Sequence, residues 1–138
     1  MIEPQAAAKG VKLDVQKGPV DIVAWADKAK VEQILLNLLS NAVKFTNAGS
    51  VTLQCSRRDS KSVSIAVADT GRGIPANHLE KIFEPFVQVG RSLTQSHEGT
   101  GLGLAISRDL ARAMGGDILV TSELDKGSRF TLILPSAP

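Results

Sequence analysis

Two pairs of short apolar runs, each joined by a tight polar turn, constrain the fold of this chain most strongly. The first pair covers residues 50–57 and 61–69, and the second covers 117–122 and 128–134. Runs of this length and alternation are typical of strands, and strands joined by short turns pair antiparallel. The sequence therefore predicts a sheet whose strands are mostly antiparallel.

Further strands and helices complete the predicted elements. Strands are expected at 11–15 and 20–25, long helices at 27–46 and about 100–114, and a short helix at 77–82. The chain lacks the strict strand–helix alternation of a doubly wound sheet, so the helices are expected on one face of the sheet. The predicted fold class is a two-layer α/β sandwich, which forms a single domain of 138 residues.

The composition indicates a globular protein that has no nucleic-acid or membrane surface. The formal net charge is +2, aromatic residues make up 4% and Tyr is absent, which argues against base-stacking platforms. No apolar run approaches the roughly 18 residues of a membrane span and no signal peptide is visible, so we expect a cytoplasmic domain, whether or not a longer parent is membrane-anchored. Cys55, the one cysteine, fits a reducing compartment and is predicted to fill the core.

Glycines alternate with other residues in Gly99–Leu104, where the helix predicted at about 100–114 begins. Free backbone N–H groups and the positive end of a helix dipole suit a phosphate chain at such a position. The pattern lacks the Gly-Lys-Ser/Thr ending of a Walker A loop and the Gly-x-Gly-x-x-Gly spacing of dinucleotide sites. The polar stretch 87–99, which has no periodicity, is predicted to be a functional lid. A flexible turn before a helix is the alternative interpretation.

A polar line accompanies the apolar stripe of the helix predicted at 27–46. Asn37, Asn41 and Lys44 lie at i, i+4 and i+7 and therefore stack along one side of the helix. Asn is a poor helix former, so two of them in mid-helix are unusual for packing alone. An amide oxygen is a suitable Mg²⁺ ligand and an ammonium group suits a phosphate. A solvated helix face is the alternative.

An acidic residue, Asp69, ends the apolar run of the fourth predicted strand and is followed by Gly71 and Gly73. A carboxylate that faces inward at a strand end needs hydrogen-bond donors, and the amino group of adenine is one. The two glycines would allow the backbone to approach a flat ring. An Asx-turn that stabilises the loop is the alternative interpretation of this pattern.

These three segments together resemble the N, G1 and G2 boxes of the ATP-binding catalytic domain of bacterial sensor histidine kinases. That domain belongs to the wider family of gyrase, Hsp90, histidine kinases and MutL, which has the Bergerat ATP-binding fold. Residues 82–86 resemble the F box of the family, and 114–118 and 127–135 resemble its closing segment. The resemblance extends from about Gly10 to Pro135.

The resemblance implies a site for Mg-ATP. Asp69 would bind the adenine amino group, and Asn41 would ligate Mg²⁺ between the phosphates. Asn37 and Lys44 would hold the phosphate tail and act in transfer. The remaining implied contacts to ATP are Phe45, Gly71, Gly73, Ile74, Gly99, Thr100, Gly101, Leu102, Gly103, Leu104 and Ser128. Phe83 and Phe86 would anchor the lid, and Arg91 is the candidate lid cation for the γ-phosphate.

The residue at position 37 indicates which chemistry to expect. In ATP-hydrolysing relatives the matching position resembles a general-base Glu, whereas Asn37 carries an amide that cannot take a proton at neutral pH. Glu32 is not an obvious substitute. The resemblance therefore implies transfer of the γ-phosphoryl group to a protein histidine, in two-component signal transduction, rather than hydrolysis.

In this family the acceptor histidine lies on a separate helical dimerisation domain of the same or a partner kinase chain. A response regulator is the indirect partner. Neither His78 nor His97 has the surroundings of an acceptor, so we expect an isolated, monomeric catalytic domain that does not phosphorylate itself. A serine kinase of the anti-sigma-factor type and a non-catalytic ATP-binding module are the alternatives.

Overall fold

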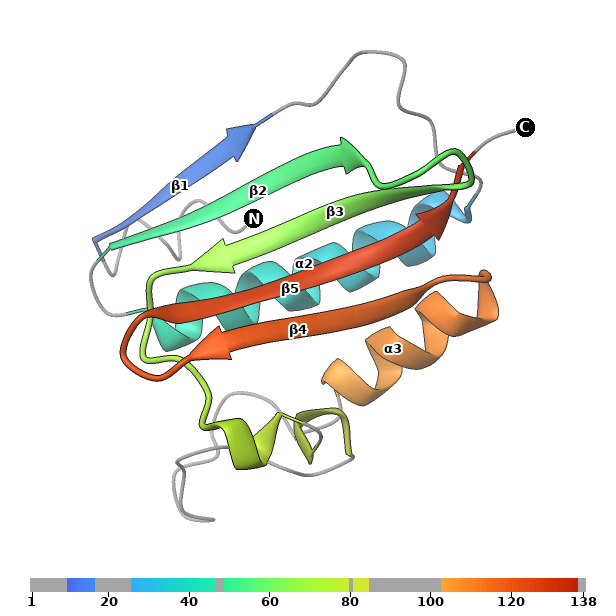
Figure 1. The fold of residues 1–138 in the computed structure, drawn as a ribbon. Helices are drawn as coiled ribbons and strands as arrows, with labels where there is room; N and C mark the ends of the chain where they lie inside the picture. The colour runs from blue at the N-terminus through green and yellow to red at the C-terminus, as the bar shows by residue number, and fades with distance from the viewer. Residues whose placement is uncertain (1–9, 17–25, 47–48, 80, 85–102, 137–138) are drawn as a thin grey trace.

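The structure, a computed structural model of the chain, describes residues 10–16, 26–46, 49–79, 81–84 and 103–136. Its elements in chain order are β1 (Val11–Gln16), α2 (Lys28–Phe45), β2 (Gly49–Arg57), β3 (Ser62–Asp69), the 3-10 turns η1 (Ala76–His78) and η2 (Lys81–Phe83), α3 (Gly103–Ala113), β4 (Asp117–Glu123) and β5 (Gly127–Pro135). The strands form a sheet in the order β1-β2-β3-β5-β4, and α2 and α3 lie on the same face of it (Figure 1). The predicted two-layer α/β sandwich is confirmed.

Antiparallel pairing dominates the described sheet, as the short turns predict. β2 pairs antiparallel with β3, β3 with β5, and β5 with β4. β1 instead runs parallel to β2, with Val11 opposite Gly49. Parallel neighbours need a crossover connection, and the chain between these two strands contains α2. The other predicted N-terminal strand, 20–25, lies outside the described residues.

Polar side chains cap both ends of α2. Asp27 Oδ1 accepts hydrogen bonds from the backbone N–H groups of Ala29 (3.0 Å) and Lys30 (3.3 Å), which a helix start would otherwise leave without partners. At the other end, the hydroxyl of the buried Thr46 donates to the carbonyl oxygen of Ala42 (2.8 Å). The helix therefore runs between the two residues at which the sequence predicts its ends.

A glycine turn ends α3. Gly115 has a φ of 84°, a left-handed conformation that glycine adopts without steric cost. Its N–H donates to the Arg112 carbonyl (3.1 Å), and the Gly116 N–H donates to the Ala111 carbonyl (2.9 Å). These bonds satisfy the last carbonyl groups of the helix, so it stops where the glycine pair predicts. The predicted start near Thr100 lies outside the described residues.

The single short helix predicted at 77–82 is wrong, because two separate 3-10 turns, η1 and η2, occupy this region. Each is three residues long, which is too short to nucleate an α-helix. Packing holds η2 in place. Ile82 is buried, and the Phe83 ring lies edge-on to Phe130 with 6.4 Å between the ring centroids.

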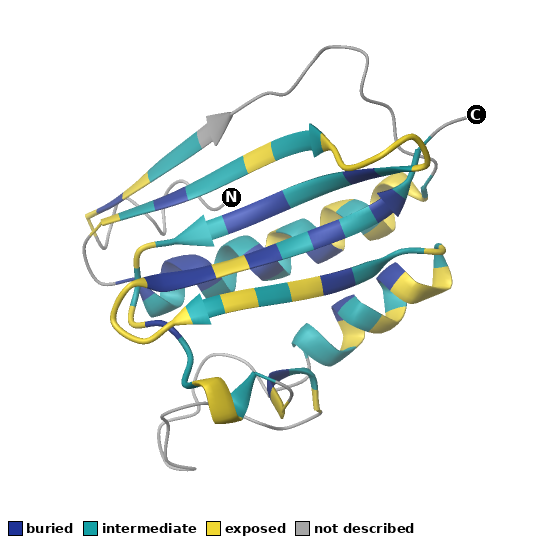
Figure 2. Ribbon diagram, viewed as in Figure 1, coloured by how far each residue is buried: buried dark blue, intermediate teal, exposed yellow. Residues whose placement is uncertain are grey.

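The core lies between the two helices and the facing side of the sheet. Every second residue of β5 is buried there, namely Phe130, Leu132 and Leu134 (Figure 2). Burial of such a side chain stabilises the fold by roughly 1.5–3 kcal/mol. The buried residues of α2 are Ile34, Leu38, Ala42 and Val43.

Two features bear on the predictions made from composition. Cys55 of β2 is half-buried opposite Ile65, and burial raises the pKa of its thiol, which disfavours the reactive thiolate. Among the described helices, none has both the length and the apolar character that crossing a membrane requires.

Candidate functional site

Asp69 lies at the end of β3, opposite Ser128 at the start of β5. Its Oδ1 accepts hydrogen bonds from the backbone N–H groups of Gly71 (2.9 Å) and Ser128 (3.3 Å). No donor among the described residues bonds to Oδ2. Burial raises the pKa of Asp69, although both N–H groups act in the opposite direction. The Asx-turn to Gly71 is therefore present, and the hydrogen bonds among the described residues involve only one of the two carboxylate oxygens.

The loop after Asp69 packs tightly against the end of α2 and the β4–β5 turn. A Cβ on Gly71 would collide with the Phe45 carbonyl oxygen, and one on Gly73 would collide with the Glu123 carbonyl oxygen. Gly73 also has a φ of 72°. The Arg72 carbonyl accepts a hydrogen bond from the Asp125 N–H (2.8 Å). Close packing within the protein thus accounts for both glycines, whatever a ligand requires.

A hydroxyl network supports the Asp69 end of the sheet. Ser122 Oγ of β4 accepts from the Ile74 N–H (2.7 Å), donates to the Gly127 carbonyl (3.0 Å) and lies 2.8 Å from Ser128 Oγ. Ser128 is buried, and its own N–H holds Asp69. The network therefore connects Ile74, Ser128 and Asp69, all three of which the sequence proposed for the site.

The amide of Asn37 lies between α2 and the first turns of α3. Its Nδ2 donates to Ser107 Oγ (3.1 Å), and a Cβ on Gly103 would collide with its Oδ1. Asn41, one helical turn further along α2, is half-buried. The start of α3 is thus directly beside Asn37, which belongs to the polar line of α2. The N box on α2 and the G2 box at the start of α3 must lie side by side in this way if they form one site.

Two cations stack on the ring of Phe45 at the end of α2. The Arg72 guanidinium lies 4.6 Å and Lys44 Nζ 5.5 Å from the ring centroid. Residues 37 and 45 are about 12 Å apart along the helix axis at 1.5 Å per residue. The Asp69 loop contacts one end of this run and α3 contacts the other, so α2 connects the two halves of the candidate site.

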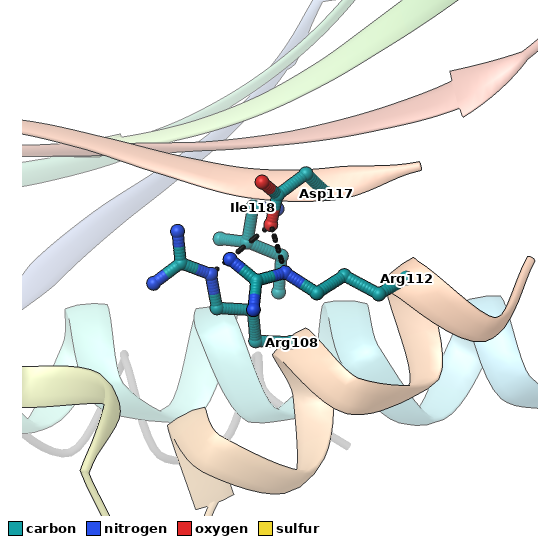
Figure 3. Close-up of polar contacts among 4 residues, drawn as sticks. All are labelled: Arg108, Arg112, Asp117 and Ile118. Carbon is teal, nitrogen blue, oxygen red and sulfur yellow. Dashed lines mark hydrogen bonds and ion pairs between the residues drawn. The ribbon is translucent and has the colours of Figure 1, made fainter. Parts of the chain in front are cut away.

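An ion-pair cluster ties α3 to β4 (Figure 3). Asp117 Oδ1 accepts hydrogen bonds from Arg108 Nε (3.0 Å), Arg112 Nε (3.2 Å) and the Ile118 N–H (2.8 Å). Burial acts to raise the pKa of Asp117, but these bonds outweigh it and hold that pKa below its usual range. The Arg108 guanidinium also lies 4.3 Å from the ring centroid of Phe83, so it connects η2 to α3.

Several predicted site residues are not tested by this geometry. Leu104 is half-buried and packs against the core. The following lie outside the described residues: Gly99, Thr100, Gly101, Leu102, Arg91, His97 and Phe86.

Sequence reasoning missed Ser107, Ser122 and Arg108. Ser122 could have been found from strand register, since it lies opposite Ser128. Ser107 and Arg108 carry no sequence signal of their own.

Comparison with known proteins agrees with this arrangement. Residues 26–138 match the family described as histidine kinase-, DNA gyrase B- and HSP90-like ATPases. The autoinducer 2 sensor kinase/phosphatase LuxQ of Vibrio vulnificus is 43% identical over 138 residues, which cover 96% of this chain and 16% of LuxQ. The sensor histidine kinase RcsC of Escherichia coli is 46% identical over 116 residues, which cover 84% of this chain and 12% of RcsC. The chain thus spans a small part of these relatives.

Solved structures share the fold. Full-length ShkA in complex with AMPPNP superposes with a TM-score of 0.87 at 40% identity, covering 99% of this chain and 28% of ShkA. The catalytic domain of the histidine kinase ThkA superposes with a TM-score of 0.82 at 27% identity, covering 99% of this chain and 88% of that domain. The predicted Bergerat fold is confirmed, and the chain belongs to the family of histidine kinase-, DNA gyrase B- and HSP90-like ATPases.

Proposed function

We propose that this chain is the catalytic domain of a sensor histidine kinase, which binds Mg-ATP and donates the γ-phosphoryl group to a histidine on a separate helical domain. The observation that carries the proposal is the geometry of Asp69. Two backbone N–H groups hold its Oδ1, and Oδ2 has no donor in the described part of the chain. This oxygen can accept a hydrogen bond from the adenine amino group. The names of the relatives, sensor kinases, support the same activity.

The base would lie at the Asp69 end of the site. Gly71 and Gly73 hold the loop backbone in place beside Asp69, and Ile74 and Leu104 would form apolar walls. Phe45, whose ring stacks with the Arg72 guanidinium, would lie near the sugar or the base. Ser128 presents its backbone N–H to Asp69 and would orient the carboxylate toward the base.

The phosphates would lie along α2 and the start of α3. Asn41 offers an amide oxygen, the hard type of donor that Mg²⁺ prefers, and the ion would neutralise phosphate charge when bound. Asn37 and Lys44 would hold the phosphate tail from the same side of α2. The Gly99–Leu104 segment would supply backbone N–H groups at the helix start.

Transfer would depend on positioning rather than on a general base. The bond between the γ-phosphorus and the bridging oxygen breaks, a bond to an imidazole nitrogen forms, and ADP leaves. Such a step needs mainly alignment and charge neutralisation. The amide of Asn37 cannot activate water by accepting a proton, which favours the histidine acceptor over hydrolysis.

The partners follow from this chemistry. The acceptor helix would belong to the same or a partner kinase chain, with a response regulator as the next recipient. We expect the isolated domain to be monomeric and to act in the cytoplasm, including when its parent is membrane-anchored.

A labelling experiment tests the proposal. The chain is incubated with Mg-ATP labelled at the γ-phosphate and with a histidine-bearing helical domain from a similar sensor kinase. We expect label on that domain that is removed by acid, because phosphohistidine is acid-labile. With the variant Asp69→Asn we expect no label. Acid-stable label would instead indicate a serine kinase, and nucleotide binding without transfer would indicate a non-catalytic module.

A further inference from the structure

Ser107 is a buried polar residue on the side of α3 that faces α2. Its side chain is 2% exposed, although serine is usually found at the surface. Its Oγ lies 3.1 Å from Asn37 Nδ2, a contact between residues 70 positions apart in the chain. A buried hydroxyl needs a hydrogen-bond partner, and this one has the amide of the polar line on α2.

Two groups one helical turn apart on α3 define the orientation of that amide. The α-carbon of Gly103 lies so close to Asn37 Oδ1 that a Cβ there would collide with it. Ser107 accepts from Nδ2 on the other side. The amide oxygen of Asn37 therefore faces Gly103, and its amide nitrogen faces Ser107.

We infer that Ser107 is a positioning residue, which holds the Asn37 amide with its nitrogen directed to bind phosphate. An amide nitrogen carries two hydrogens. Ser107 accepts one of them, and the second is available to a phosphate oxygen. The inference rests on the proposed function, because it assigns Asn37 to the phosphates.

A double-mutant cycle tests the coupling. Affinity for Mg-ATP is measured by calorimetry on the whole chain and on the variants Ser107→Ala, Asn37→Ala and the two combined. We expect Ser107→Ala to weaken binding about two- to tenfold, the equivalent of one hydrogen bond. In the Asn37→Ala background the same change should have no further effect. An equal loss in both backgrounds, or no loss in either, would overturn the inference.

Matched variants separate this role from general packing. Ser64→Ala removes another half-buried hydroxyl contact, the 2.9 Å pair with Ser56, and should leave affinity unchanged. Ser107→Cys keeps a side chain of similar size but provides a weak acceptor. Its affinity for Mg-ATP should therefore resemble that of Ser107→Ala. It replaces the alanine variant if that variant does not fold. An unaltered chain that fails to bind Mg-ATP would refute the proposed function itself, whereas binding without coupling would refute only the role of Ser107.

Discussion

At the scale of single residues, Asp69 combines a structural contact with a cost in stability. Burial raises the pKa of this carboxyl above its usual range, and the hydrogen bonds from Gly71 and Ser128 only partly oppose the shift. A group with a raised pKa binds its proton more tightly in the folded state. Its contribution to stability is therefore complete below the unfolded pKa and declines as the pH rises through the folded pKa. At neutral pH the ionised carboxylate of Asp69 opposes folding.

Asp69→Asn should separate stability from nucleotide binding. An amide oxygen can still accept from both N–H groups, and the buried charge is gone, so the melting temperature at pH 7 should equal or exceed that of the unaltered chain. The rise in melting temperature that Mg-ATP produces in the unaltered chain should be absent. Thermal denaturation with and without Mg-ATP checks both points. A less stable variant, or one that keeps the nucleotide effect, would contradict the assignment.

Gly73 combines a left-handed backbone with close packing against a neighbouring carbonyl group. Gly73→Ala should be destabilised by about 1–2 kcal/mol for the left-handed backbone and by a further 1–3 kcal/mol or so for the collision with the Glu123 carbonyl. Gly10→Ala is the matched control, because φ is 71° at Gly10 and 72° at Gly73, while nothing lies within 4 Å of a Cβ at Gly10. Urea denaturation measures the free energy of unfolding of both variants. If the two variants lose the same free energy, the chain has relieved the collision at Gly73.

At the scale of elements, the Asp117 cluster fixes α3 to the sheet. The folded pKa of Asp117 is lowered, so its stabilising contribution is present above the unfolded pKa and is lost as the pH falls through the folded value. Asp117→Asn should cost about 0.5–1 kcal/mol at pH 7, a modest value because the side chain is 33% exposed. The difference from the unaltered chain should disappear as the pH falls below the usual Asp range, as denaturation at several pH values would test.

The pair of Glu123 and Lys126 provides the control for that prediction. Its side chains are 69% and 72% exposed, and exposed ion pairs contribute little. Glu123→Gln should therefore leave stability nearly unchanged at every pH. If Asp117→Asn behaves in the same way, the arginine cluster does not hold α3 on β4.

At the scale of the whole molecule, the chain should not phosphorylate itself. His78 lies in η1, and its Nδ1 is buried without a hydrogen-bond partner among the described residues, so that nitrogen is not presented to an incoming phosphoryl group. His97 lies outside the described residues. After incubation of the chain alone with γ-labelled ATP, neither histidine should carry label by mass spectrometry. Label on either one would contradict the prediction.

The elements of the sandwich were predictable because their signals are local. Asp27 begins α2, the Gly115–Gly116 pair ends α3, and short polar turns join β2 to β3 and β4 to β5. Each of these features depends on a few neighbouring residues, whose capping or backbone preference needs no tertiary contact. The exception, the region of η1 and η2, lacks the length that makes a helix signal reliable.

The amino-acid sequence by itself determined the strands that the structure describes, the described parts of the two long helices and which polar residues were candidates for a nucleotide site. Only the tertiary structure decided that β1 runs parallel to β2, that Ser122 supports Ser128, and that Ser107 holds Asn37. The physical reason is the range of the interactions. Caps and turns act between neighbours in the chain, whereas these contacts depend on strand register and on how two helices pack across one face of the sheet.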